Sequence, residues 1–178
     1  MLSLQRLLSR SLRHGLREGR GLSGKREPST WKSAMADDRS AIKLWFDRWG
    51  SQVAAKDFKS ARKLFSDEAL GFGTWMDFVE GLDALESRQW QSIWPTISNF
   101  HHRTDDSLQV TVSPDRLMAV GLVLWTSKGF DADGTSFERP GRTTAVFTRA
   151  ATTEEWSCVH THVSLARGVP QQSFGQSE

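Results

Sequence analysis

Hydrophobic residues between positions 40 and 94 recur at the spacing of helices. Residues 40–56 place five apolar side chains on one helical face, namely Ile42, Trp45, Phe46, Trp49 and Val53. A shorter helix is expected to follow from Asp57, whose carboxylate would cap the free N–H groups of its first turn. A third helix is expected over residues 82–94, because Pro95 ends its apolar repeat.

From residue 97 onwards the hydrophobic period changes to two. The alternation predicts strands over residues 97–103, 108–112, 137–149 and 156–165. Residues 117–127 are nearly continuously apolar, which is typical of a central strand buried on both faces. Residues 69–74 form a shorter strand, in which Gly71 and Gly73 indicate a bulge or the close approach of another part of the chain. Helices followed by consecutive strands predict an α+β fold.

One domain over residues 35–168 and two terminal segments account for the 178 residues. Residues 1–34 hold eight basic and two acidic residues, a net charge of +6, whereas the remainder holds fifteen and nineteen, a net charge of −4. The basic segment has a leucine stripe and little acid, which is typical of a mitochondrial transit peptide. Two alternatives remain open. Met35 could be the true start of a cytoplasmic protein, or residues 1–34 could form a disordered basic arm. Residues 169–178 are expected to be a frayed polar tail.

The composition excludes several classes of partner. The acidic body gives no reason to expect nucleic-acid binding, and no apolar run approaches the roughly 18 residues of a transmembrane helix. The single cysteine, Cys158, cannot form an intrachain disulfide, and its place within a strand predicts a buried structural thiol. Nothing in the sequence predicts a cofactor.

The C-terminal strand carries the sequence WSCVHTHVS at residues 156–164, preceded by GRTT at residues 141–144. With the helix around Trp45, GFGT at residues 71–74 and the spacing of Trp90, Trp94 and Pro95, these motifs resemble a SnoaL-like domain of the nuclear-transport-factor-2-like superfamily. The resemblance covers roughly residues 41–165. The closing motif is also similar to the association (hub) domain of calcium/calmodulin-dependent kinase. The resemblance implies a curved, mixed or antiparallel sheet wrapped around three helices into a cone with a pocket, and a homodimer.

Members of these families include isomerases, cyclases, dehydratases and non-catalytic association modules. The resemblance therefore implies a pocket for a small apolar organic molecule, with acid–base isomerase or cyclase chemistry as a further hypothesis. The alternative is a non-catalytic dimerisation or association module. The ketosteroid isomerases of the superfamily use a tyrosine hydroxyl. This chain has no tyrosine, so their mechanism cannot transfer intact.

His160 and His162 are candidates for catalysis. They lie two residues apart on a strand and point to one face, and a neutral imidazole can serve as a general acid or base. No metal site is predicted, because a third ligand is missing and the adjacent His101 and His102 would point to opposite faces of another strand. Asp77, a carboxylate among apolar residues near the expected mouth, is a further catalytic candidate.

The two faces of the last strand are expected to differ in role. The more apolar set should face the helices and the pocket: Val159, Thr161, Val163 and Leu165. The other set should face away, towards a subunit interface: Trp156, Cys158, His160, His162 and Ser164. A catalytic histidine would require the opposite assignment.

The expected pocket walls are mainly aromatic. The candidate ligand-binding residues are Phe72, Trp75, Trp94, Trp125, Arg142, Thr161 and Val163. Arg142 could bind a carboxylate or phosphate side-on, with a structural role beside a neighbouring acid as the alternative. By its resemblance to the hub domain, this chain has Ala145 and Val163 where the hub pocket carries arginines, so its own pocket is expected to be apolar.

Overall fold

The computed structural model describes residues 28–175 of the chain. Its first helix, α1, spans Pro28–Ala55 and therefore begins well before the expected start at residue 40. Residues 28–34, predicted to belong to the basic N-terminal segment, are continuous with this helix. The transit-peptide prediction falls mostly on residues 1–27, which lie outside the described residues. Across residues 28–175, no helix combines the length and the apolar character that a membrane crossing demands.

Eight strands form one curved sheet, in the order β2-β1-β8-β7-β5-β3, with β4 and β6 also paired to β5. The strands are β1 Phe65–Phe72, β2 Phe78–Glu80, β3 Ser98–His102, β4 Gln109–Val112, β5 Met118–Phe130, β6 Ser136–Glu138, β7 Gly141–Thr148 and β8 Ser157–Leu165. Every pairing is antiparallel except that of β1 with β8. The predicted α+β fold with a mixed sheet is confirmed.

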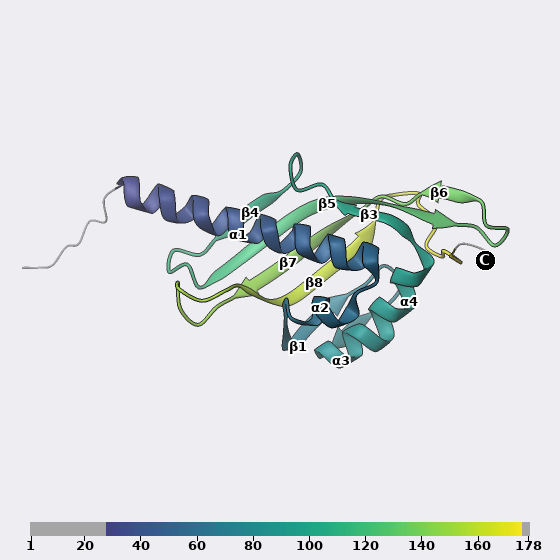
Figure 1. Ribbon diagram of the computed structural model, residues 1–178, viewed down its shortest axis with the longest axis horizontal. Helices are drawn as coiled ribbons and strands as arrows, with labels where there is room; N and C mark the ends of the chain where they lie inside the picture. Colours follow the sequence, from purple (N-terminus) through teal and green to yellow (C-terminus); the bar gives the residue numbers. More distant parts are fainter. Residues whose placement is uncertain (1–27, 176–178) are drawn as a thin grey trace, which may run out of the picture.

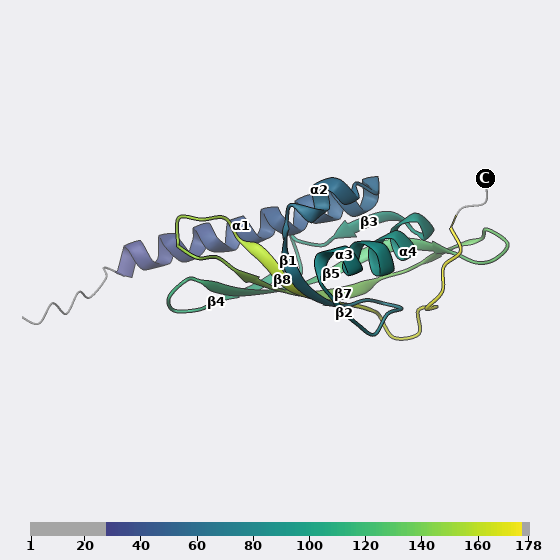
Figure 2. The ribbon, with the colours of Figure 1, turned by 90° about the horizontal axis from the view of Figure 1, so that it is seen from below.

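The helices cover one side of this sheet, as Figure 1 and Figure 2 show from two directions. The short helix α2, Phe58–Arg62, follows α1, and Asp57 Oδ1 accepts a hydrogen bond from the Ser60 N–H at 3.0 Å, as the predicted cap requires. The apolar face of α1 is buried against the sheet, as its periodicity predicts. No helix of residues 28–175 lies on the other face of the sheet.

The third helical segment is composite. It consists of α3 Leu82–Ala84, the π-helix η1 Leu85–Trp90, α4 Gln91–Ile93 and the 3₁₀ turn η2 Trp94–Thr96. Gly71 and Gly73 let this segment approach β1 closely. A Cβ atom on Gly71 would lie 2.5 Å from a methyl carbon of Leu85, and one on Gly73 would lie 2.2 Å from Gln89 Nε2. The close approach predicted for these two glycines is thus explained by the side chains of η1.

A β-bulge at Val159 changes the predicted faces of β8. The register pairs Val146 with His160 but Phe147 with Cys158, so Val159 is the extra residue. Cys158 is consequently buried in the core rather than facing outwards, and the predicted face assignment is wrong on the N-terminal side of the bulge. Beyond the bulge, Thr161 is buried while His162 is exposed, which matches the expected alternation.

The C-terminal residues up to Gly175 are not frayed. Gln171 Nε2 donates to the Thr74 carbonyl at 2.8 Å. The Ser173 hydroxyl donates to the Thr96 carbonyl at 2.6 Å and accepts from the Phe130 N–H at 2.9 Å. These bonds fasten residues 171–174, hereafter the C-terminal strap, to β5, to η2 and to the loop after β1. A segment of polar composition is therefore held by hydrogen bonds to backbone groups that sheet pairing leaves free.

Candidate functional site

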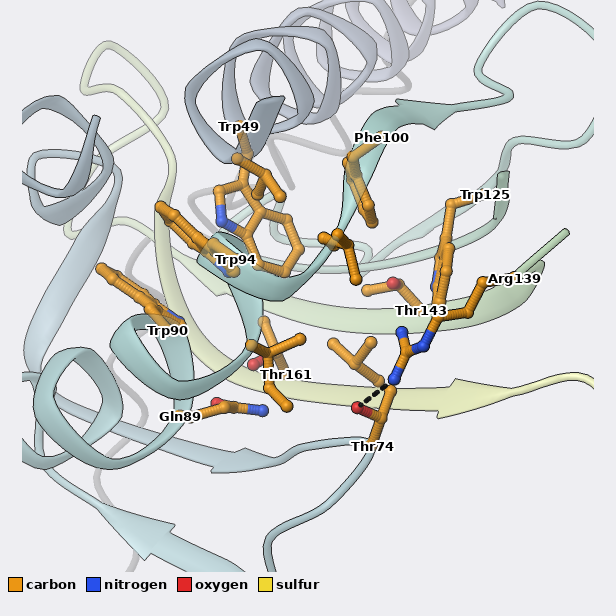
Figure 3. Close-up of a pocket in the computed structure, with 14 residues that line it drawn as sticks. Trp49, Thr74, Gln89, Trp90, Trp94, Phe100, Trp125, Arg139, Thr143 and Thr161 are labelled. Atoms are coloured by element: carbon orange, nitrogen blue, oxygen red, sulfur yellow. Dashed lines mark hydrogen bonds between the residues drawn. The ribbon is translucent and has the colours of Figure 1, made fainter. Parts of the chain in front are cut away.

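A pocket lies between the helices and the concave face of the sheet (Figure 3). Its free volume is about 40 Å³, room for roughly three water molecules at ~10–15 Å³ each. Fourteen residues from α1, the composite helix, four strands and three loops line it, namely Trp49, Val53, Thr74, Gln89, Trp90, Ile93, Trp94, Ile97, Phe100, Trp125, Arg139, Thr143, Thr161 and Val163. This cavity inside the cone is almost filled by side chains.

Aromatic rings form most of the pocket wall. Trp90 and Trp94 stack on each other with centroids 5.0 Å apart at 15°, and Phe58 continues the stack behind Trp94 with the same spacing. Phe100 and Trp125 face each other on the sheet side, 5.2 Å apart. These rings offer flat apolar surfaces on two sides of the cavity, which suits the body of an aromatic or aliphatic molecule.

Polar atoms without partners are concentrated in the same pocket. Eight buried side-chain nitrogen or oxygen atoms of the described residues make no hydrogen bond, and five of them belong to pocket-lining residues. The five are Trp49 Nε1, Gln89 Oε1, Trp125 Nε1, Arg139 Nε and Thr143 Oγ1. Because an unpaired buried polar group costs about 1–3 kcal/mol, this concentration marks a place where partners from outside the chain can bind.

Arg139 is the charged member of the lining. It lies in the interruption between β6 and β7, where its backbone N–H donates to the Ser127 carbonyl at 2.8 Å and its carbonyl accepts from the Ser127 hydroxyl at 2.8 Å. These bonds fix the interruption against β5, and the side chain turns inwards between Thr74 and Thr143 (Figure 3). Burial lowers the pKa of Arg139 to about 10, so the guanidinium is still charged at neutral pH.

Two glycines make room for this arrangement. A Cβ atom on Gly129 would lie 2.9 Å from Cδ of Arg139, and one on Gly141 would lie 2.1 Å from a ring carbon of Trp125. Both glycines lie in strands, where this residue is unfavourable unless something approaches closely. The Phe137 ring would lie closer still to a Cβ atom on Gly129, at 2.5 Å, so this glycine accommodates Phe137 as well as the pocket residue Arg139.

Of the seven residues predicted to bind a ligand, four line the pocket and three lie outside it. Trp94, Trp125, Thr161 and Val163 line the pocket. Phe72, Trp75 and Arg142 lie outside it. Trp75 is 53 % exposed in the loop after β1, and Arg142 is exposed with its Nε donating to the Ser164 hydroxyl at 2.9 Å.

The three candidates for catalysis also lie outside the pocket. Asp77 is exposed in the loop between β1 and β2. His160 and His162 are on the outer face of the sheet, where the Phe72 ring lies 5.9 Å and 5.4 Å from the two imidazoles. None of the three can therefore reach a molecule bound between the helices and the sheet in this structure.

Sequence reasoning missed the polar part of the pocket. The expectation of an apolar pocket is met at Val163, whereas Ala145 is buried in the core outside the lining, and the expectation overlooked Arg139 and Gln89. Arg139 falls within the strand predicted over residues 137–149, which the structure interrupts between β6 and β7, and Gln89 reads as one polar residue within a helical repeat. The only local signal was Gly129 and Gly141, two strand glycines facing bulky neighbours.

The fold and pocket define a class: an α+β cone with a curved sheet, covered by helices on its concave side. The family model described as a SnoaL-like domain matches residues 42–168, so the chain belongs to the SnoaL-like domain family. The resemblance to this family is thereby confirmed. A search of curated proteins found no match.

Solved structures with the same fold come from several organisms. A nuclear transport factor 2-like superfamily protein from Salmonella enterica is 18% identical with a TM-score of 0.62, covering 79% of this chain and 99% of its own. The association domain of CaMKII from C. elegans is 15% identical with a TM-score of 0.56, covering 75% and 98%. A putative scytalone dehydratase from Novosphingobium aromaticivorans is 9% identical with a TM-score of 0.65, covering 83% and 95%. These likenesses establish the fold.

Proposed function

We propose that the pocket binds a small organic molecule, with its apolar body against the aromatic rings and a polar end among Gln89, Arg139 and Thr143. The observation that carries this proposal is the concentration of unpaired buried polar atoms in the pocket lining. A pocket kept only for packing would gain stability from apolar replacements at these positions. Ligand sites, in contrast, combine apolar walls with a few converging polar groups.

The lining favours binding over proton-transfer chemistry. Its only ionisable side chain is Arg139, and it contains no carboxylate, imidazole, thiol or amine that could exchange a proton near neutral pH. The acid–base isomerase or cyclase hypothesis therefore finds no general acid or base among the described pocket residues. A binding protein fits this site better than an isomerase does.

The test uses benzyl alcohol as a neutral probe and the pocket tryptophans as reporters. We expect benzyl alcohol to quench or shift the tryptophan fluorescence of the full chain with saturable binding. Val163→Phe fills the cavity and should abolish this binding. Ser164→Phe adds the same ring on the opposite face of β8 and should retain it. Equal loss in both variants, or no saturable signal from this probe and the aromatic probes used below, would remove the support for a pocket ligand.

Self-association is a second candidate function, and the outer face of the sheet favours it. One cross-strand row on this face consists of Leu122, Thr144, His162, Phe72 and Phe78. All but Thr144 are exposed, and three of them are large hydrophobic residues. An apolar sheet face without covering helices is typical of a surface that pairs with another copy. The proposed assembly is a homodimer through this face.

A further inference from the structure

The pocket contains a guanidinium without a counter-charge. Arg139 is 1% exposed, and no carboxylate of residues 28–175 lies within 4.0 Å of it, since it is absent from every ion pair among them. Its chain neighbour Glu138 pairs instead with Lys128 at 3.4 Å. Burying a charge is unfavourable unless it is paired. An anion that binds beside Arg139 would therefore offset the cost of burying this guanidinium.

Most of the N–H groups of Arg139 are unoccupied. A guanidinium has five N–H donors, and the hydrogen bonds of this one both come from Nη2. They go to Thr74 Oγ1 and to the Gln171 carbonyl, each at 3.3 Å. These bonds are long and their acceptors are neutral. Nε and both N–H groups of Nη1 have no partner among the described residues. A planar anion can therefore bind Nε and Nη2 together side-on if it displaces the long bonds of Nη2 to these neutral acceptors.

The surroundings select the kind of anion. Among residues 28–175, Arg139 is the only cation in the lining, so it matches one negative charge better than the nearly two charges of a phosphate monoester. Thr143 Oγ1 and Gln89, both unpaired in part, supply neutral hydrogen-bonding groups in the same cavity. Trp94, Phe100 and Trp125 supply flat apolar walls. A carboxylate on a small aromatic or aliphatic body meets all of these conditions.

We propose that the ligand of this pocket is a small organic carboxylate whose charged group is bound by Arg139. The inference rests on the proposed binding function and specifies the class of molecule. The carboxylate lies between Thr74 and Thr143, where Figure 3 shows the guanidinium directed. Because the free volume is about 40 Å³, a ring-sized body requires small displacements of the half-buried lining residues Ile93 and Val163.

The first experiment compares matched probes on the full chain. Benzoate is compared with benzamide, and phenylacetate with phenylacetamide, by tryptophan fluorescence and calorimetry at neutral pH. Each pair shares its ring and differs mainly in charge. We expect the carboxylate of at least one pair to bind about tenfold or more tightly than its amide, since hydrogen bonds to charged groups are the stronger ones. Equal or tighter binding of both amides overturns the inference.

The second experiment removes the charge. Arg139→Met should abolish the preference for the carboxylate while leaving amide binding within a few-fold, and Arg139→Lys should weaken the preference because the planar fork is lost. Arg142→Met removes a nearby exposed arginine outside the pocket and should change neither. A carboxylate preference that survives in Arg139→Met also overturns the inference.

Thermal unfolding separates a ligand-binding role from a structural one. Replacing a buried, unpaired charge by an apolar side chain of similar length should leave the melting temperature unchanged or raise it. A clear fall in Arg139→Met would assign the guanidinium to holding Thr74 and Gln171 instead. If no carboxylate or amide binds and Val163→Phe changes nothing, the proposed function fails. If the amides bind as well as the carboxylates, only the carboxylate assignment fails.

Discussion

Asp38 Oδ1 lies 2.8 Å from Nη2 of Arg149, although 111 residues separate them in the chain. Its other oxygen, Oδ2, lies 2.6 Å from Nε of Arg116. The Arg149 guanidinium also lies 4.0 Å from the centre of the Trp156 ring. One buried carboxylate on α1 is therefore bound by arginines from the β4–β5 turn and from the end of β7. This cluster fastens α1 to the sheet far from the pocket.

Replacing this carboxylate should destabilise the protein strongly. Asp38→Asn leaves the two arginines without a counter-charge, and breaking a buried ion pair in this way costs about 3 kcal/mol. Urea unfolding at pH 7 measures the loss. Asp37→Asn changes the neighbouring exposed residue and should cost less than about 0.5 kcal/mol. Similar losses in both variants would contradict the role assigned to the cluster.

The same cluster contributes to acid sensitivity. Desolvation would raise the pKa of Asp38, but the hydrogen bonds and charges of Arg116 and Arg149 outweigh it and hold the pKa below its usual 3.8. A lowered carboxyl pKa gives stability that is present above pH 3.8 and is lost as the pH falls through the folded-state value. Unfolding free energies between pH 5 and 3 should therefore depend less on pH in Asp38→Asn.

His102 predicts a second loss of stability on acidification, which begins at a higher pH than the loss due to Asp38. Its imidazole is buried between Phe46, Trp49 and Phe100, and Nδ1 donates to the Phe46 carbonyl at 3.0 Å. Desolvation lowers the pKa of His102 from 6.5 to about 4. The unfolded chain therefore takes up a proton first, and stability should fall as the pH drops from about 6.5 towards 4, by up to ~1.4 kcal/mol per pH unit.

His102→Asn is the matched test, since the amide N–H can still donate to the Phe46 carbonyl while the side chain no longer titrates. Urea unfolding from pH 7 to pH 4.5 should give a flatter profile for this variant. His101→Asn, at the neighbouring exposed position, should keep the original slope. An unchanged slope in His102→Asn would show that other groups, such as His160, dominate this pH range.

Gly141→Ala should damage both the core and the pocket. The added methyl group would lie 2.1 Å from a ring carbon of Trp125 and 2.4 Å from the Ser164 carbonyl oxygen. Neither the packed indole nor the strand backbone can move away without a large cost in free energy. We expect a loss of about 3 kcal/mol and altered fluorescence from a displaced Trp125. Arg142→Ala, one position along β7 on the outer face, is the control and should cost less than about 1 kcal/mol.

A charge on the outer sheet face tests the proposed homodimer. Leu122→Glu places a carboxylate in the middle of the exposed cross-strand row, so it should shift the protein from dimer to monomer in light scattering at micromolar concentration. Leu44→Glu alters a leucine of similar exposure on α1, 49% against 46% for Leu122, and should leave the dimer intact. A wild-type chain of monomeric mass would refute the dimer directly.

The histidine pair offers a second test of the same face. His160→Ala with His162→Ala should weaken the dimer while pocket binding of the aromatic probes stays unchanged, because both imidazoles lie outside the pocket lining. Loss of probe binding with the dimer intact would mean that the roles are exchanged, with the histidine face of β8 at the ligand site and the other face at the interface. The histidines would then return as candidates for catalysis.

Periodicity predicted the parts of this fold in which every turn or every second residue contacts one surface. Ile42 to Val53 on α1 and the inward side chains Thr161 and Val163 follow from such repeats. The prediction that residues 117–127 are buried on both faces is wrong, because Leu122 and Leu124 are exposed on the outer face, which no helix of residues 28–175 covers. The bulge at Val159 defeats the same reasoning, because one inserted residue reverses the faces of Trp156 and Cys158 without changing composition.

The functional features that escaped prediction depend on contacts distant in the sequence. Arg139 turns into the pocket because Ser127 fixes its backbone and Gly129 leaves it room. The C-terminal strap is ordered because Thr74, Thr96 and Phe130 present free backbone groups to it. Neither set of contacts recurs at a regular spacing along the chain, so the hydrophobic pattern of the sequence could not predict it.

The parallel pairing of β1 with β8 has a consequence for how the chain folds. It joins Leu70 to His160 and Phe72 to His162, so an early strand completes its ladder only when nearly the whole chain is present. Contacts between such distant segments close large loops and slow the search for the native state. During synthesis β1 therefore cannot pair with β8 until the end of β8 has been made. Until then, only α1 and the composite helix can bury the apolar residues of β1. A chain cut before β8 should consequently collect as a partly folded, aggregation-prone species rather than as a smaller stable domain.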